Sequence, residues 1–129
     1  MSADEQIRVV IIEDNKVFRE ALELLLGLRN DLVVVASVAD GEEAVPACRE
    51  HRPDVALMDY RLPGLDGIEA TRALKEACPS VAVVALTASA NREEMEALLE
   101  AGAVATLTKD QELEEIVQAI HAAAGNFAG

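Results

Sequence analysis

Short apolar runs alternate with longer amphipathic segments five times along the chain. The runs are rich in Val, Ile and Leu and are mostly continuous, which is typical of strands covered on both faces. We expect strands at Arg8–Ile12, Leu32–Val38, Val55–Met58, Val81–Leu86 and Val104–Leu107. The amphipathic segments predict helices over Lys16–Leu28, Glu42–His51, Gly67–Ala77, Arg92–Ala101 and Glu112–Ala123.

Residues that begin helices support these boundaries. Three expected helices follow an Asp or Asn with a Glu three positions later, and the pairs are Asp40/Glu43, Asp66/Glu69 and Asn91/Glu94. This capping-box spacing supplies an acceptor for free amides and an acid in the first helical turn. Pro46 lacks an amide hydrogen, so we expect the second helix to start late or to kink.

The alternation of strand and helix within a chain of 129 residues predicts the fold. That length suits one domain. Connections from strand through helix to strand are right-handed and give a parallel sheet with helices on both faces. We therefore predict an α/β fold with a doubly wound, five-stranded parallel sheet.

Charge and composition exclude several classes of function. The chain has 24 acidic and 11 basic residues, a formal net charge of −13, which argues against nucleic-acid binding by this domain and against docking on anionic lipid. Its three aromatic residues, Phe18, Tyr60 and Phe127, offer little to stack on a base, flavin or haem. No apolar run approaches the roughly twenty residues of a membrane span, and no secretory signal is visible. Since Cys48 and Cys78 are isolated, we read them as buried reduced thiols and expect a cytoplasmic protein.

Polar residues follow four of the expected strands, at the end where doubly wound sheets bind ligands. Glu13 and Asp14 follow the first strand and Asp59 the third, while Thr87 follows the fourth and Lys109 the fifth. Each has an ordinary alternative: Asp14 could cap a helix, Thr87 could be a loop hydroxyl, and Lys109 could be a solvated surface lysine. The coincidence of all five at one edge of the sheet favours a functional site.

Three carboxylates in one pocket repel one another, and a bound hard cation relieves that repulsion. A site with few carboxylate oxygens and with room for water ligands fits Mg²⁺ better than Zn²⁺. It also fits Mg²⁺ better than Ca²⁺ held by a full set of protein oxygens. Mg²⁺ beside a lysine and a threonine is typical of phosphoryl chemistry. Because the chain has no P-loop and no Ser or Cys beside a His, Asp59 is the candidate nucleophile, forming an aspartyl phosphate.

Four motifs, in this order, resemble a bacterial response-regulator receiver domain. They are VVIIEDN (residues 9–15), LMDYRLPGLDG (57–67), ALTAS (85–89) and LTKD (107–110). The resemblance covers about residues 7–124, with residues 1–6 as an N-terminal tail and residues 125–129 as the start of a linker or a C-terminal tail. DGEEA (40–44) and the pair Lys109-Asp110 resemble the NarL/FixJ-like subclass, whose receivers precede a LuxR-type DNA-binding domain.

The resemblance implies a flavodoxin-like strand order of 2-1-3-4-5 and a phosphorylation-controlled switch. By this resemblance, Asp59 accepts a phosphoryl group from a sensor histidine kinase in a Mg²⁺-dependent reaction. Asp14, Asp59 and the backbone carbonyl of Arg61 bind the Mg²⁺ directly, and Glu13 binds it through a water. Self-phosphorylation and self-dephosphorylation of this kind are stoichiometric, so no turnover enzyme is expected.

The resemblance also implies roles in switching for several further residues. Lys109 pairs with the phosphoryl oxygens, and Thr87 hydrogen-bonds one of them and senses the group. Arg61 and Ser89 occupy positions that tune the lifetime of the phosphate. Thr106 stands where the family usually has a Tyr or Phe that rotates inward, so this chain lacks the ring for that half of the switch.

Several readings stay open at this point. The output is expected to be transcriptional, through a C-terminal domain absent from this chain, although a solitary receiver and a homodimer both fit the family. An interaction module that works without phosphorylation is the alternative that Thr106 favours. A flavodoxin-like electron carrier lacks a phosphate loop and flanking aromatics here, and a haloacid-dehalogenase-type phosphatase would carry a second acid where Arg61 stands.

Overall fold

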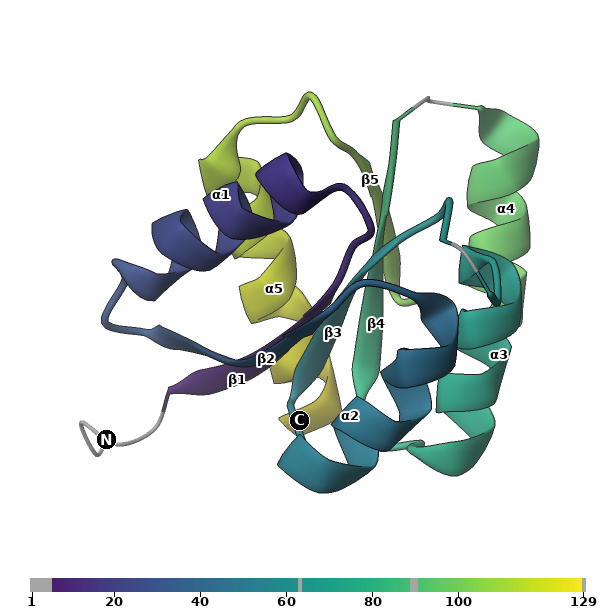
Figure 1. Cartoon of the computed structure of the whole chain (residues 1–129), viewed down its shortest axis with the longest axis horizontal. Helices are drawn as coiled ribbons and strands as arrows, with labels where there is room; N and C mark the ends of the chain where they lie inside the picture. Colours follow the sequence, from purple (N-terminus) through teal and green to yellow (C-terminus); the bar gives the residue numbers. More distant parts are fainter. Residues whose placement is uncertain (1–5, 63, 89–90, 129) are drawn as a thin grey trace.

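The computed structural model describes residues 6–62, 64–88 and 91–128 of the chain. Within these residues, five strands and five α-helices alternate (Figure 1). The strands are β1 (Ile7–Ile12), β2 (Leu32–Val38), β3 (Val55–Asp59), β4 (Ala82–Thr87) and β5 (Ala105–Thr108). The helices are α1 (Lys16–Gly27), α2 (Ala44–His51), α3 (Gly67–Ala77), α4 (Arg92–Ala101) and α5 (Leu113–Ala128).

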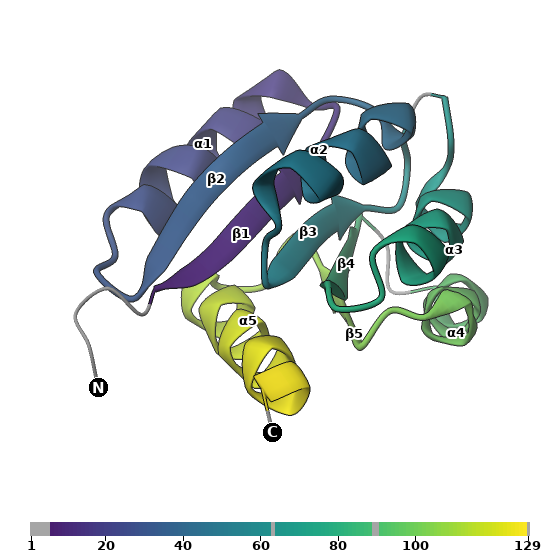
Figure 2. The same cartoon turned by 90° about the horizontal axis from the view of Figure 1, so that it is seen from below.

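The strands form one parallel sheet in the order β2-β1-β3-β4-β5, which confirms the predicted doubly wound fold. Helices α1 and α5 cover one face of the sheet, and α2, α3 and α4 cover the other (Figure 2). Each face has its own buried core: Leu26 and Ile120 lie on the first, and Leu74 and Leu98 on the second. Within the described residues, no helix is both long and apolar enough to cross a membrane.

The helix starts follow the capping pattern. Asp66 and Glu69 form a complete capping box, in which Glu69 N–H donates to Asp66 Oδ1 at 2.9 Å and Asp66 N–H donates to Glu69 Oε1 at 3.4 Å. The Asp40 side chain accepts the N–H of Glu43 and thereby caps a short 3₁₀ turn, Gly41–Glu43, that precedes α2. These caps fix where the connecting loops at the carboxyl edge of the sheet end.

Several boundaries differ from the sequence prediction by a single residue; β3 and β4, for example, end at Asp59 and Thr87, one residue later than expected. Two helix boundaries differ by more. Helix α2 begins at Ala44 rather than Glu42, which places Pro46 in the first turn, where a missing amide hydrogen breaks no helical bond. Helix α5 continues to Ala128, past the predicted end at Ala123, because the run Ala122–Ala124 favours helix and Gly125 does not end it. The assignment of residues 125–129 to a linker or tail stays a prediction.

Candidate functional site

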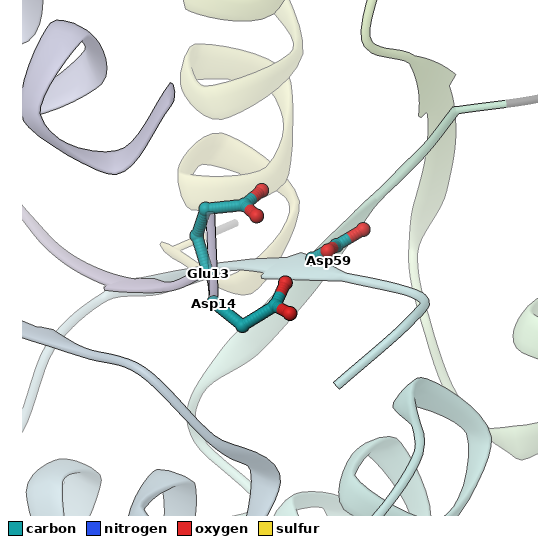
Figure 3. Close-up of side chains that lie close together, drawn as sticks. All are labelled: Glu13, Asp14 and Asp59. Carbon is teal, nitrogen blue, oxygen red and sulfur yellow. The ribbon is translucent and has the colours of Figure 1, made fainter. Parts of the chain in front are cut away.

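Three carboxylates meet at the carboxyl edge of the sheet. Glu13 and Asp14 come directly after β1, and Asp59 is the last residue of β3, the strand that pairs with β1. One carboxylate oxygen from each residue lies within 4.8 Å of the others (Figure 3). Glu13 and Asp59 are 1% and 4% exposed, whereas Asp14 is exposed. The cluster therefore has a buried side and a side open to solvent.

Lys109 supplies the positive charge of this cluster. Its Nζ lies 2.7 Å from Glu13 Oε1 and 3.2 Å from Asp59 Oδ2. Its main-chain N–H donates to the carbonyl oxygen of Thr87 at 2.8 Å, which ties the loop after β5 to the end of β4. One ammonium group thus pairs with two of the three carboxylates. The remaining negative charge and the all-oxygen donor set fit a hard divalent cation such as Mg²⁺.

The surroundings of Asp59 disfavour its ionised form. Burial raises the pKa of the Asp59 carboxyl above its usual range, and the nearby charge of Glu13 raises it further, against the opposing effect of Lys109. Burial alone lowers the pKa of Lys109, but the hydrogen bond to Glu13 and the charge of Asp59 outweigh burial and raise it. Lys109 therefore stays charged, and a bound cation would favour the ionised form of Asp59.

The first turn of α1 holds Glu13 in place. Asn15 N–H donates to Glu13 Oε2 at 3.0 Å, and Arg19 Nη1 donates to the Glu13 carbonyl at 2.9 Å. Asn15 Oδ1 in turn accepts the N–H of Phe18 at 3.0 Å and is the N-cap of α1. The cap is thus Asn15 and not Asp14, so the alternative reading of Asp14 as a helix cap is wrong.

Two residues of the site lie outside the strand-end pattern. The ring of Phe18 lies 4.8 Å, centroid to atom, from Lys109 Nζ. Arg19 reaches the backbone of Glu13 from the first turn of α1. The sequence indicates these two residues only through their positions, three and four residues after Asn15. Those positions place them in the first turn of α1 once Asn15 is known to be the N-cap of that helix.

The remaining predicted residues have different surroundings. Thr87 is buried at the end of β4. The backbone of Arg61 acts on the Asp59 carboxyl and lowers its pKa slightly, while the Arg61 side chain is largely exposed, with Nη2 at 3.9 Å from Glu94 Oε2. Thr106 is half-buried on β5, in register with Ala85 of β4. Ser89 lies outside the described residues.

Comparisons with known proteins agree with this geometry. The family model of the response regulator receiver domain matches residues 9–121. The chain is 40% identical over 114 residues to the response regulator GacA of Pseudomonas viridiflava, an alignment that covers 88% of this chain and 53% of GacA. It is 38% identical over 114 residues to the transcriptional regulatory protein LnrK of Bacillus subtilis, covering 88% of this chain and 52% of LnrK. The chain thus spans about half the length of these relatives.

Solved structures give the same assignment. The signal receiver domain of the response regulator NarL from Mycobacterium tuberculosis superposes with a TM-score of 0.90 at 35% identity, covering 94% of this chain and 98% of that one. A LuxR-family two-component response regulator from Aurantimonas superposes with a TM-score of 0.88 at 34% identity, covering 94% of this chain and 86% of that one. The similarity of fold therefore extends over nearly the whole chain.

Proposed function

Because the chain belongs to the response regulator receiver domain family, we propose that it is a signalling switch whose phosphoacceptor is Asp59. The observation that carries the proposal is the buried Asp59 carboxylate beside Lys109 Nζ, within a cluster of three carboxylates at the carboxyl edge of the sheet. The family implies a cognate histidine kinase, and we place the reaction between the two proteins in the cytoplasm.

The transfer proceeds at the Asp59 carboxylate. An oxygen of Asp59 forms a bond to phosphorus as the bond from phosphorus to the kinase's histidine nitrogen breaks, and the leaving imidazole takes up a proton. Asp14, Asp59 and the backbone carbonyl of Arg61 would hold Mg²⁺ directly, and Glu13 would hold it through a water. When bound, Mg²⁺ would supply positive charge that offsets the charge on the transferring group, and Lys109 would add to this effect.

The switch follows from what the new phosphoryl group attracts. The buried Thr87 would hydrogen-bond a phosphoryl oxygen, and Lys109 would exchange carboxylate partners for the phosphoryl group. Thr106 has no ring to move inward, so we assign the relay to β4, β5 and the loop that carries Lys109. Arg61 and Ser89 would tune how long the phosphate persists.

The output lies beyond this domain. The relatives that are named as transcriptional regulators are about twice as long as this chain, so we propose that a DNA-binding domain provides the output. The receiver itself would contact the kinase and, by analogy with the family, a second copy. A net charge of −13 leaves DNA contact to that other domain.

Intact mass after incubation with Mg²⁺ and acetyl phosphate tests the proposal. We expect one added phosphoryl group on the wild type, none on Asp59→Asn, and a normal adduct on the matched control Asp54→Asn, which is altered at the opposite end of β3. An adduct that persists in Asp59→Asn would reject Asp59 as the acceptor. A folded wild type that takes up neither phosphoryl nor beryllofluoride would favour the phosphorylation-independent interaction module that Thr106 suggests.

A further inference from the structure

The aromatic ring of Phe18 contacts the ammonium group of Lys109. Nζ lies over the ring at 4.8 Å from its centroid, and the two residues come from the first turn of α1 and the loop after β5. A cation within about 6 Å of a ring face is attracted by the ring quadrupole. The contact therefore joins distant segments of the chain at an ammonium group that lies 3.2 Å from Asp59 Oδ2.

The ring is held independently of the lysine. Phe18 N–H donates to Asn15 Oδ1 at 3.0 Å, and Asn15 N–H donates to Glu13 Oε2 at 3.0 Å, so the start of α1 is fixed to the acidic cluster. The Phe18 side chain is half-buried and packs against the core beneath α1 and α5. Lys109, by contrast, has a long flexible side chain, so the ring can restrict where its ammonium group lies.

A ring and a carboxylate hold an ammonium group in different ways. Glu13 and Asp59 form ion pairs with Lys109 and neutralise part of its charge. A ring attracts the cation without adding a further negative charge that would compete with an incoming phosphoryl group. The Lys109 side chain is 21% exposed, so the contact is partly desolvated, which strengthens such an attraction.

We propose that Phe18 is a positioning residue for Lys109. Its ring keeps the ammonium group beside Asp59 without neutralising it, so that Lys109 is already in place when a phosphoryl group arrives. This inference rests on the proposed function of Asp59 and adds a residue that the strand-end motifs do not contain. The competing explanation is that Phe18 only fills space at the edge of the core.

A fluorination series separates these explanations, because fluorine weakens the ring quadrupole and changes ring shape little. Phe18 is replaced by 4-fluoro-, 3,5-difluoro- and 3,4,5-trifluorophenylalanine, and beryllofluoride affinity is measured with saturating Mg²⁺. We expect stepwise weakening that totals roughly three- to tenfold, an equal loss in Phe18→Leu, and affinity close to wild type in Phe18→Tyr. Lys109→Met should itself weaken beryllofluoride binding, because Lys109 pairs with the phosphoryl oxygens, but fluorination of Phe18 should cause no further weakening in that background, since no cation remains over the ring.

Proton chemical shifts of the Lys109 ε-methylene group provide a second readout, which does not depend on phosphoryl chemistry. The ring should shift them upfield in the wild type, and Phe18→Leu should remove the shift. A flat fluorination series, or the absence of a ring-dependent shift, would overturn the inference while leaving Asp59 as the acceptor. Failure of the wild type to bind beryllofluoride would instead reject the proposed function, and with it the role given to the ring.

Discussion

At the scale of single residues, the three carboxylates of the site have unequal surroundings. Glu13 and Asp59 are buried and share Lys109, so a change at either residue also removes one of the two ion pairs of that lysine. Asp14 is exposed and lies at the open side of the cluster. Changing Asp14 therefore tests cation binding while both ion pairs of Lys109 stay in place.

We expect Asp14→Asn to weaken Mg²⁺ binding at least about tenfold, because even the loss of an outer partner of a metal ligand typically reduces affinity about 10–100-fold. Calorimetric titration with MgCl₂ measures the change. The matched control is Asp110→Asn, which alters another exposed Asp that is not part of the acidic cluster. Equal affinities of Asp14→Asn and the wild type would reject Asp14 as a ligand.

At the scale of elements, a close backbone approach joins the end of β3 to the start of α3. A Cβ on Gly67 would lie 2.7 Å from Tyr60 Cα, closer than real Cβ atoms come, and 3.0 Å from the Asp59 carbonyl oxygen. Gly67 N–H also donates to the Tyr60 carbonyl at 2.8 Å. Any side chain at residue 67 must therefore displace the backbone that carries Asp59.

Gly67→Ala should lower the free energy of unfolding by about 1–3 kcal/mol, the usual range for overpacking, as measured by urea denaturation. Gly27→Ala is the matched control, because Gly27 ends α1 and a Cβ there meets nothing within 4 Å. That change should be neutral or stabilising by up to about 1 kcal/mol, since Ala favours helix over Gly. Similar losses in both variants would contradict the close approach at Gly67.

Some features of this molecule can be predicted from local sequence, and others cannot. Continuous apolar runs and capping pairs such as Asp66/Glu69 are local signals, and they place strands, helix starts and the acids at strand ends. The approach of Tyr60 to Gly67 and the ring of Phe18 over Lys109 depend on how separate segments pack. No local pattern encodes such contacts, so they emerge only when the whole fold is assembled.

A second link between elements joins the start of β2 to α5. Asp31 Oδ1 lies 3.0 Å from Arg29 Nε, and Asp31 Oδ2 lies 2.6 Å from His121 Nε2. The hydrogen bond from Arg29, with a smaller one from His121, lowers the pKa of Asp31 from 3.8 to about 2. Folding therefore favours the ionised carboxylate, so its stabilising effect is present above pH 4 and is lost as the pH falls towards 2.

We expect Asp31→Asn to lower the free energy of unfolding at pH 6 by at most about 1 kcal/mol, because the pair is partly exposed and screened by solvent. The difference from wild type should shrink between pH 4 and pH 2 and vanish below it. Denaturation curves across this range provide the measurement, and Arg29→Gln should reproduce the same pH dependence. A difference that grows on acidification would show that the sign of the linkage is wrong.

At the scale of the whole molecule, two electrostatic effects act on stability. The net charge of −13 produces repulsion spread over the surface, and the acidic cluster concentrates it at one edge of the sheet. Monovalent salt screens the first effect, since the Debye length falls from about 30 Å at 0.01 M to about 8 Å at 0.15 M ionic strength. A divalent cation bound at the cluster reduces the repulsion among its carboxylates. Because the cluster forms only in the folded protein, the cation stabilises only the folded state.

Melting temperatures in KCl and in MgCl₂ at equal ionic strength separate these effects. Both salts should raise the melting temperature, but in the wild type MgCl₂ should give an additional rise, worth about 2.7 kcal/mol when free Mg²⁺ is one hundred times its dissociation constant. Asp14→Asn should respond to KCl like the wild type and lose most of the additional rise. If the two proteins instead gained equally from MgCl₂, the stabilisation would come from general screening, and the acidic edge could not be a folded-state Mg²⁺ site.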